Sequence, residues 1–383
     1  MSFWGYIRPD GSVGTRNYVG IISSVTCAND VAHWITQQVP GCAFFIHQQG
    51  CGQSKPDMEM VHRTLISLGR HPNLAAVLLV SLGCEGSVDH IVEGMAACGK
   101  PVEKIAIQEL GGASAALAKG TGLARQMLTD ASRMHPEEVD DSELMIGVKC
   151  GASDTTSGLA SNPGIGAACD ILIEKGGSCI FGETPEMMGA EHILARRAAN
   201  PEIAQKIMEI VNRFEQRALS MGVDMRGANP SRGNIAAGLT SIEEKSLGAI
   251  VKGGTTPIMG VCEHGERPKG KGLFILDGPG QEPKAVTALA AAGAQVILFS
   301  TGIGAPQGFP FVPVIKVTSN PKTYQRLSDH IDVYVDIAAE ASLKELGQAI
   351  FDETLTVASG KKTKAEALGY GYFPDIWVPG TTF

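Results

Sequence analysis

The sequence has few aromatic residues, no block of basic residues and no long apolar run. Aromatic side chains occupy 5% of the 383 positions, so rings cannot dominate the core. No apolar run approaches the roughly 18 residues that a membrane-spanning helix needs. The first residues also lack the basic region and apolar stretch of a secretory signal. We therefore expect a cytoplasmic protein without a membrane partner.

Positive charge is also scarce: 32 lysines and arginines are outnumbered by 40 aspartates and glutamates, which gives a net charge of −8. Nucleic-acid binding depends on basic side chains that neutralise phosphates, so we expect no nucleic-acid partner. The apolar fraction of 44% and the charged fraction of 19% are ordinary for a globular protein, and they exclude extensive disorder. A chain of this length can form two or three domains.

Nine cysteines are present, and no two of them form a CxxC pair. The missing pair argues against a closed zinc finger. An odd number of cysteines, in a compartment that keeps thiols reduced, argues against a disulfide framework. Some of these thiols are therefore candidates for metal ligands or nucleophiles.

Glycine, by contrast, is abundant, with 47 residues, and many glycines end apolar runs. Strand patterns alternate with helix patterns along the chain, which predicts βαβ units and mostly parallel sheets flanked by helices. We predict an α/β protein with two Rossmann-like domains, 1–137 and 142–383, joined by an acidic connector. The second domain contains a long glycine-rich loop at 222–254. In such folds the active site lies at the carboxyl ends of the strands.

One stretch organises this prediction. The apolar run 144–148 leads into Lys149-Cys150-Gly151-Ala152-Ser153-Asp154, which is typical of a strand that delivers polar groups at its end. Ser153 and Asp154 are therefore predicted to bind substrate. A second glycine-rich turn, with Gly302 and Gly304, fails as a dinucleotide fingerprint, and we expect its backbone amides to bind a substrate carboxylate.

Cys51, Cys84 and Cys150 share one pattern, because each lies just past a predicted strand and precedes Gly or Glu-Gly. Parallel strands bring such ends to one edge of a sheet, so the three thiols could meet as metal ligands. They could equally be small residues in tight turns. His47 and Cys262 are further candidate ligands. The remaining cysteines fall within helix or strand patterns and are expected in the core: Cys27, Cys42, Cys98, Cys169 and Cys179.

Several charged and polar residues at the other strand ends complete the candidate site. Acid or base candidates are Glu85, Glu183, Glu186, His192 and His264. Arg16 and Asn234 lie in polar loops and are expected to hold substrate. A single turn histidine or loop arginine is also compatible with a purely structural or solvated role.

Short motifs along the whole chain carry a family resemblance. They are Gly5-Tyr6, Gly14-Thr15-Arg16-Asn17-Tyr18, Gly50-Cys51-Gly52-Gln53, Gly69-Arg70-His71-Pro72-Asn73, Gly83-Cys84-Glu85, Gln108-Glu109, Cys150-Gly151-Ala152-Ser153-Asp154, Glu183-Thr184-Pro185-Glu186 and Ile242-Glu243-Glu244-Lys245-Ser246-Leu247-Gly248. In this order they resemble the altronate/galactarate dehydratase family.

The resemblance implies a lyase that depends on Fe²⁺ or Mn²⁺, with an iron–sulfur cluster left open as an alternative. The implied reaction is β-elimination of water from a sugar acid of the altronate or galactarate type, giving a 2-keto-3-deoxy acid. The family is also similar to the large subunit of (2R)-sulfolactate sulfo-lyase, so elimination of sulfite to give pyruvate is the alternative. A non-catalytic binding subunit is the rival class.

Fused members of the family carry a small SAF-type domain ahead of the Gly-Tyr segment. Only four residues precede Gly5 in this sequence. The resemblance therefore implies a large subunit whose small SAF-domain partner is a separate chain, and an active site that is incomplete in this chain alone. We expect the protein to act on a small hydroxy acid as part of an oligomer.

Overall fold

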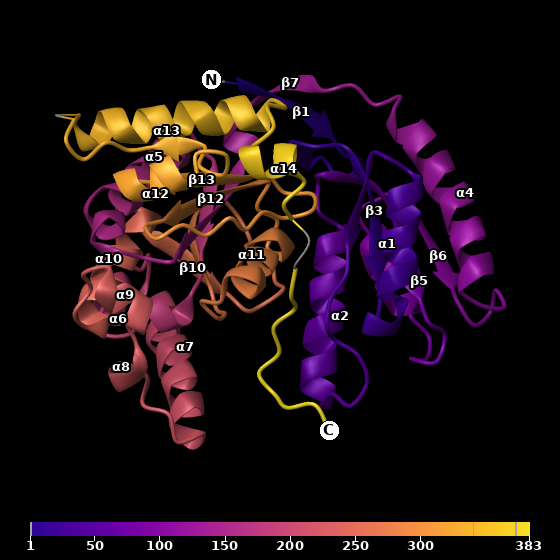
Figure 1. The fold of residues 1–383 in the computed structure, drawn as a ribbon, viewed down its shortest axis with the longest axis horizontal. Coiled ribbons are helices and arrows are strands. Elements are labelled where there is room, and N and C mark those ends of the chain that lie inside the picture. Colours follow the sequence, from indigo (N-terminus) through magenta and orange to yellow (C-terminus); the bar gives the residue numbers. More distant parts are fainter. Residues whose placement is uncertain (1, 340, 372–373) are drawn as a thin grey trace.

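Two parallel sheets flanked by helices form the protein (Figure 1). The computed structural model describes residues 2–339, 341–371 and 374–383. The prediction of an α/β fold with mostly parallel sheets is confirmed. Within the described residues no helix is both long and apolar enough to span a membrane.

The first sheet has four parallel strands in the order β4-β3-β5-β6. The strands are β3 (Tyr18–Ser23), β4 (Cys42–Phe45), β5 (Leu74–Ser81) and β6 (Val102–Ala106). The helices are η1 (Thr26–Ala28), α1 (Asn29–Gln38), α2 (Lys55–Gly69), α3 (Asp89–Ala96) and α4 (Ala113–Ala131). The chain passes from β3 to β4 on one side and returns to β5 on the other. The strand order therefore reverses between β3 and β5, and such reversal points are where open α/β sheets bind ligands.

The second sheet has seven parallel strands in the order β10-β11-β9-β8-β12-β13-β14. These are β8 (Met145–Gly151), β9 (Ser178–Phe181), β10 (Ile258–Cys262), β11 (Gly272–Leu276), β12 (Val296–Thr301), β13 (Val314–Thr318) and β14 (Val333–Tyr334). Here the order reverses between β8 and β12. We call the two reversal points the N-terminal and the C-terminal switch points.

Helices cover both faces of the second sheet (Figure 1). The helices of this half of the chain are η2 (Asp141–Glu143), η3 (Ser157–Ser161), α5 (Asn162–Glu174), η4 (Thr184–Met187), α6 (Glu191–Arg196), α7 (Pro201–Ser220), α8 (Met225–Ala228), α9 (Arg232–Ala236), α10 (Ile242–Ile250), η5 (Val251–Gly253), α11 (Glu282–Ala291), α12 (Pro321–Arg326), α13 (Leu343–Ala358) and α14 (Lys364–Leu368). The predicted loop 222–254 thus contains several short helices.

Local sequence accounts for most element ends. Asn200 caps α7 by accepting from the Ile203 backbone N–H at 2.9 Å, and Pro201 suits the first turn of that helix. Ser342 and Glu345 form a capping box at the start of α13. Every residue of β5 is buried, as expected of a central parallel strand rich in Leu and Val.

A small antiparallel sheet joins the two halves of the chain. Strand β1 (Ser2–Ile7) pairs with β2 (Val13–Gly14) and with β7 (Glu137–Asp140). The acidic connector is therefore partly a strand. Its acidic side chains gave no strand signal, because its partner β1 lies more than a hundred residues away.

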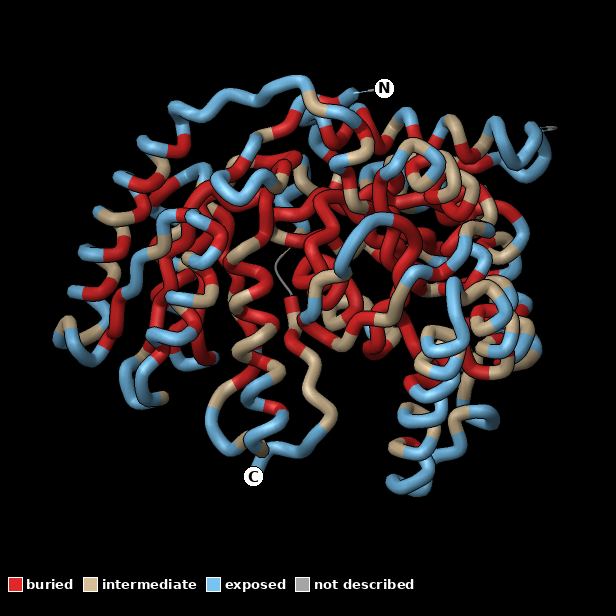
Figure 2. Tube along the Cα trace, turned by 180° about the vertical axis from the view of Figure 1, so that it is seen from behind, coloured by how far each residue is buried: buried red, intermediate tan, exposed pale blue. Residues whose placement is uncertain are grey.

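The two sheets share one apolar core. Leu65 and Leu68 of α2 are fully buried in the same cluster as Leu289 of α11 and Phe299 of β12. Figure 2 shows buried segments through the centre of the molecule, while the far end of α7 projects into solvent. The two halves therefore bury one continuous apolar cluster between them.

Residues 374–383, which we call the C-terminal strap, run between the two halves (Figure 1). The side chains of Gln48 and Gln49 donate to the Ile376 carbonyl at 2.7 and 2.6 Å. Trp377 stacks on Phe214 of α7 at 6.4 Å between ring centroids. The strap thereby links the first sheet's loops to the second half.

Candidate functional site

The C-terminal switch point is organised by Asp154, in the loop after β8. One carboxylate oxygen accepts from the backbone and hydroxyl of Ser157, both at 2.9 Å, and the other accepts from the Asn320 amide at 2.8 Å. Gly302 lies so close that an added Cβ would stand 2.1 Å from the Asp154 carboxylate. Glycine is therefore required where the loops after β8 and β12 meet.

A buried ion triad lies beneath this loop. Glu183 accepts from Lys149 at 2.6 Å and from Lys252 at 2.9 Å, and all three side chains are 1% exposed. Burial opposes these charges, but the two lysines outweigh it and lower the pKa of Glu183, just as Glu183 raises the pKa of Lys149. Two ammonium groups and one carboxylate leave the triad itself with an excess positive charge, which the nearby Glu282 carboxylate opposes, because it also raises the pKa of Lys149.

The triad is tied directly to Cys150. Glu183 also accepts from the Cys150 backbone N–H at 3.0 Å, and Lys149 donates to the Cys150 carbonyl at 2.7 Å. The Cys150 thiol lies 3.0 Å from the Ser153 hydroxyl and accepts from the Asn162 amide at 3.3 Å. These contacts fix the end of β8 and hold Cys150 next to the buried triad.

A pocket of about 170 Å³ opens above Cys150, between η3 and α10. Its lining residues include Ser153, Asp154, Asn162, Glu244 and Lys245. The two helices approach closely at one point, where an added Cβ on Gly158 of η3 would lie 3.1 Å from the Gly248 Cα of α10. The pocket is therefore built by close approach of these two helices.

Lys245 and Glu186 form an ion pair at the side of this pocket. The Lys245 ammonium lies 3.0 Å from one Glu186 oxygen and donates to Asn229 at 2.8 Å. The second Glu186 oxygen is buried and has no hydrogen-bond partner among the described residues. Glu186 thus combines one oxygen fixed by Lys245 with one that is enclosed without a partner among the described residues.

The N-terminal switch point has a different character. Glu85 follows β5 and accepts from the Ser24 hydroxyl at 2.6 Å and from the Gly83 backbone N–H at 2.7 Å. Although partial burial opposes ionisation, these hydrogen bonds lower the pKa of Glu85. A separate pocket of about 200 Å³ lies here, lined by Glu85, Cys51 and His62 among others. Cys51 and Cys84 are exposed in this region.

The predicted metal ligands do not converge. Cys51 and Cys150 line different pockets. Cys262 ends β10, which stands three strand spacings, or roughly 14 Å, from β8. Within the described residues, no group of three or more His, Cys, Asp or Glu side chains could hold a metal ion. The donor set therefore does not fit a single Fe²⁺ or Mn²⁺ ion.

His47 is used within the protein and is corrected as a candidate ligand. Its Nε2 lies 3.1 Å from the Ser23 carbonyl, and its Nδ1 accepts from the Gln49 backbone N–H at 3.2 Å. Burial lowers the pKa of His47 to about 4. Both ring nitrogens are occupied by these bonds, so neither faces a metal. Burial likewise raises the pKa of the Cys262 thiol to about 11, which disfavours the thiolate that a metal needs.

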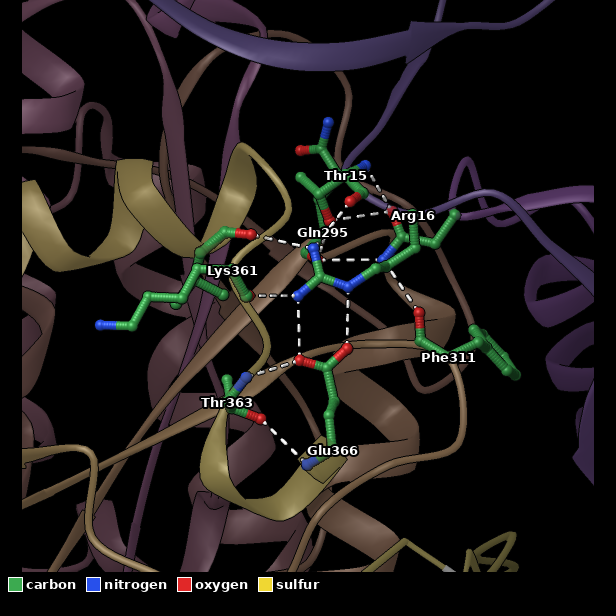
Figure 3. A network of polar contacts seen from close by, with 9 residues as sticks. Thr15, Arg16, Gln295, Phe311, Lys361, Thr363 and Glu366 are labelled. Atoms are coloured by element: carbon green, nitrogen blue, oxygen red, sulfur yellow. Dashed lines mark hydrogen bonds and ion pairs between the residues drawn. The ribbon is translucent and has the colours of Figure 1, made fainter. Parts of the chain in front are cut away.

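Arg16 is also corrected as a substrate clamp (Figure 3). Its guanidinium binds both oxygens of Glu366, at 2.8 and 2.9 Å. It also donates to the carbonyls of Thr15, Val357 and Lys361. All five N–H donors of the side chain are thereby occupied. Arg16 ties the start of the chain to α14 and leaves no donor for a carboxylate.

The remaining substrate candidates act mainly on the loops themselves. The backbone N–H of Gly302 donates to the Ala152 carbonyl at 3.1 Å, and that of Gly304 donates to the Thr301 hydroxyl at 3.2 Å. These amides are not free for a carboxylate, contrary to the sequence expectation. Asn234 donates to the Ser153 carbonyl at 2.8 Å and positions that residue from α9.

The two histidines predicted as acids or bases differ in burial. His192 is exposed at the start of α6. His264 is buried beside Trp377 of the strap, with ring centroids 5.4 Å apart, and neither ring nitrogen has a partner among the described residues. Burial lowers the pKa of His264 to about 3, so its imidazole is neutral at physiological pH.

The sequence suggests Lys252 only as a loop cation that could clamp a carboxylate, and it gives no signal for the roles of Lys149 and Lys245. Lys245 lies in the motif 242–248, which predicts a helix start. Lys149 and Lys252 flank predicted strand and helix ends, but no spacing pairs them with Glu183. A lysine directly before the Cys-Gly turn inside an otherwise apolar strand was the available signal, because buried lysines require a partner.

Comparison with known proteins places the chain in a family. Residues 5–132 match the model of the D-galactarate dehydratase/altronate hydrolase second domain, and residues 141–380 match that of the D-galactarate/altronate dehydratase C-terminal domain.

Three curated relatives span nearly all of the chain. This chain is 38% identical over 376 residues to (2R)-sulfolactate sulfo-lyase subunit beta of Chromohalobacter salexigens, and the match covers 97% of this chain and 96% of the relative. It is 35% identical to altronate dehydratase of Bacillus subtilis, covering 95% and 75%. It is 33% identical to galactarate dehydratase (L-threo-forming) of Escherichia coli, covering 94% and 73%. The chain is a lyase of the altronate/galactarate dehydratase family.

Proposed function

We propose that the chain is the large subunit of a metal-dependent lyase that removes a β-substituent from a small hydroxy acid, with water from a sugar acid as the first candidate. The observation that carries this proposal is the buried Lys149–Glu183–Lys252 triad beneath the pocket at the C-terminal switch point. Its excess positive charge in a buried setting favours an anionic ligand above it. Small hydroxy acids supply such an anion through their carboxylate.

Lys245 would complete the carboxylate site. It lines the same pocket and carries a side chain that is only 10% exposed. A desolvated ammonium binds a carboxylate more strongly than an exposed one, because solvent screens it less. Lys245 orients the acid from the pocket wall, and the buried triad, which does not line the pocket, acts on it only through its charge.

Glu186 is the proposed base. Glu183 is unsuited to that role because both of its oxygens are bound by ammonium groups and its pKa is lowered. Glu186 instead has one oxygen held by Lys245 and one without a partner among the described residues. That second oxygen is enclosed in this structure, so the Glu186 side chain has to turn toward the pocket to accept the proton next to the substrate carboxylate.

We propose metal dependence without assigning ligands in this chain, because no three described His, Cys, Asp or Glu side chains could hold an ion. The residues of this chain bind the acid, orient it and remove a proton.

Elimination of sulfite is a second candidate, and one observation favours it. The chain is 38% identical to the sulfo-lyase subunit beta and 35% identical to the altronate dehydratase of Bacillus subtilis. Sulfite leaves more readily than hydroxide, so this reaction needs less help from a general acid.

We further propose a separate small partner with an SAF-type domain. The proposal is supported by a relative named "subunit beta", which belongs to an enzyme with more than one kind of chain.

Co-expression with a candidate small subunit, under anaerobic conditions with iron, tests the function. Formation of 2-keto-3-deoxy acids from altronate and galactarate is compared with sulfite release from sulfolactate. Dehydration products would support the first candidate, and sulfite the second. If neither forms, the proposal is wrong. If Glu186→Gln and Lys245→Met leave activity intact in the complex, this chain is a non-catalytic subunit.

A further inference from the structure

Another pocket, which we call the junction pocket, lies where the strands begin, at the opposite edge from the C-terminal switch point. Its volume is about 200 Å³, and residues of both halves line it. They include Ser12, Pro72, Met145, Arg267, Lys271 and Gln295. Met145 begins β8, whereas Cys150 lies near its other end. Because β8 has 7 residues at ~3.3 Å each, the junction pocket stands roughly 20 Å from the pocket above Cys150.

The loop between β10 and β11 supplies cations to the junction pocket. It reads Arg267-Pro268-Lys269-Gly270-Lys271, with a cation at every second position. The Lys271 ammonium is half exposed, donates to the Ser142 carbonyl at 2.6 Å and lies 3.6 Å from Glu143. Arg267 is half-buried and lies against Gly293, which also lines the pocket, so that an added Cβ there would stand 3.7 Å from the Arg267 Nε. Two cations of one loop therefore form part of the pocket wall.

Most donors of Arg267 have no protein partner. Its Nη2 donates to the Ser67 carbonyl, in the last turn of α2, at 3.1 Å. The Nε is enclosed without a partner, and Nη1 reaches solvent without one, within the residues that the structure describes. A guanidinium has five N–H donors, and Arg16 uses all of its own. Arg267 is thus held at one nitrogen and keeps donors for a ligand.

Three further cations form a cluster with Arg267. Arg8 and Lys100 are buried, and both donate to backbone carbonyls just after α2 instead of to carboxylates. Arg70 has an enclosed Nε without a partner in the described part of the chain. Burial, with the Arg70 charge adding to it, lowers the pKa of Arg267 to about 10. Burial, with Arg8 and Arg267 adding to it, lowers the pKa of Lys100 to about 7. Each cation of the cluster therefore raises the cost of charging its neighbours.

Carboxylates do not balance these charges. Among the described residues, Asp10 and Glu143 approach the cluster, and both are exposed to solvent. Burial opposes ionisation of Asp10, but hydrogen bonds from Ser12 and the charges of Arg267 and Lys100 lower its pKa. With Lys271 included, five cations stand against two carboxylates when Lys100 is protonated. A buried charge is costly unless it is paired, so this excess calls for an anion.

We infer that the junction pocket binds a tetrahedral oxyanion, such as inorganic phosphate or sulfate, between Arg267 and Lys271. Arginine binds such anions through two parallel N–H···O bonds, and lysine acts as a point charge. A dianion balances the excess charge better than a single carboxylate does. Because both halves line the pocket, the bound anion also holds them together. This ligand site lies outside the proposed function and does not rest on it.

Calorimetric titration of inorganic phosphate into the full chain tests the inference, in a chloride buffer at constant ionic strength. We expect a saturable site, and a higher thermal midpoint in phosphate or sulfate than in chloride of equal ionic strength. Arg267→Met should weaken phosphate binding about tenfold or more, because it removes charge-assisted hydrogen bonds. Lys271→Met should weaken binding less, since solvent screens its half-exposed ammonium.

Three variants serve as controls, and circular dichroism establishes that each is folded. Arg125→Met removes an exposed cation from α4, and Lys245→Met removes the cation of the pocket above Cys150. Both should bind phosphate at the junction pocket as the unchanged chain does. Arg267→Lys keeps the charge but loses the paired donors, so its affinity should lie between those of the unchanged chain and Arg267→Met.

Three results would overturn the inference. Phosphate and sulfate would act no more strongly than chloride at equal ionic strength, the phosphate site would be lost in Lys245→Met instead, or folded Arg267→Met and Lys271→Met would both bind phosphate with unchanged affinity. If Arg267→Met does not fold, Lys271→Met decides the question alone, because its half-exposed side chain is not part of the core. Unchanged affinity in that variant would then reject the site.

Discussion

Both switch points lie where the strand order of a parallel sheet reverses, but different side chains surround them. At the C-terminal switch point the loop polar groups bind one another, the thiol of Cys150 is buried, and a triad with excess positive charge lies beneath a small pocket. At the N-terminal switch point three thiols stay exposed, and hydrogen bonds from Thr26 to Gln49 and from Ser24 to Glu85 join the loops. Strand order therefore locates a ligand site, whereas the residues after the strands decide its chemistry.

The sharpest test of this contrast is Glu183→Gln. It leaves Lys149 and Lys252 buried without a counter-charge, so we expect the free energy of unfolding to fall by about 3–5 kcal/mol. Denaturant titration measures the loss. As a control, Lys361→Met removes a half-exposed ammonium that pairs with Glu353, and it should cost at most about 1 kcal/mol. Equal effects for the two variants would show that the triad is not a special feature.

Glu186→Gln addresses the chemistry of the same region. If its free oxygen accepts the substrate proton, kcat should fall about 10²–10⁴-fold with little change in folding. Lys245→Met should mainly raise KM, because it removes part of the carboxylate site. Steady-state kinetics on the two-subunit complex separate these effects, with Glu353→Gln on α13 as an inert control. Unchanged kcat in Glu186→Gln would move the catalytic centre away from this pocket.

Gly302→Ala probes how tightly the loops of the C-terminal switch point close. The added Cβ would overlap the Asp154 carboxylate, so we expect a loss of about 1–3 kcal/mol in stability. Gly122→Ala is the matched control, since nothing lies within 4 Å of an added Cβ in α4. Better helix propensity should make that control neutral or stabilising. The thermal midpoints of the two variants should therefore shift in opposite directions.

The smallest effect is expected at the N-terminal switch point, where Glu85 is partly exposed. Its pKa is lowered from 4.5 in the folded protein, so the unfolded chain binds its proton first as pH falls. The contribution of Glu85 is present above pH 4.5 and is lost as pH falls through the lowered value. Glu85→Gln should reduce the thermal midpoint slightly at pH 7 and flatten its fall below pH 5. A variant with the same pH profile as wild type would contradict this.

The sequence predicted the parallel strands because their apolar runs are continuous and end in glycine. The apolar run 144–148 lies in β8, which begins one residue later and continues to Gly151. Strands β1, β2 and β7 were missed because antiparallel pairing between distant, partly polar segments leaves no local pattern. The local sequence pattern was therefore enough to predict strands of the two parallel sheets, but not the strands of the small antiparallel sheet.

The candidate site was predictable only in part. The ends of β5, β8 and β9 were correctly expected to carry polar groups, because parallel strands expose their carboxyl ends. The partners of those groups were not predictable, since Lys252 reaches Glu183 and Glu366 reaches Arg16 across long stretches of chain. Burial, which removed His47 from the candidates and left Cys27 exposed where a core residue was expected, also depends on neighbours that no local window contains.

The core shared by the two sheets carries a consequence for how the molecule melts. Because Leu65 and Leu289 belong to one apolar cluster, separating the halves would expose that cluster to water. Neither half can then persist alone as an equilibrium intermediate. Unfolding should be a single cooperative transition in calorimetry, with equal calorimetric and van't Hoff enthalpies, and the segments 2–136 and 141–383 expressed separately should be aggregation-prone.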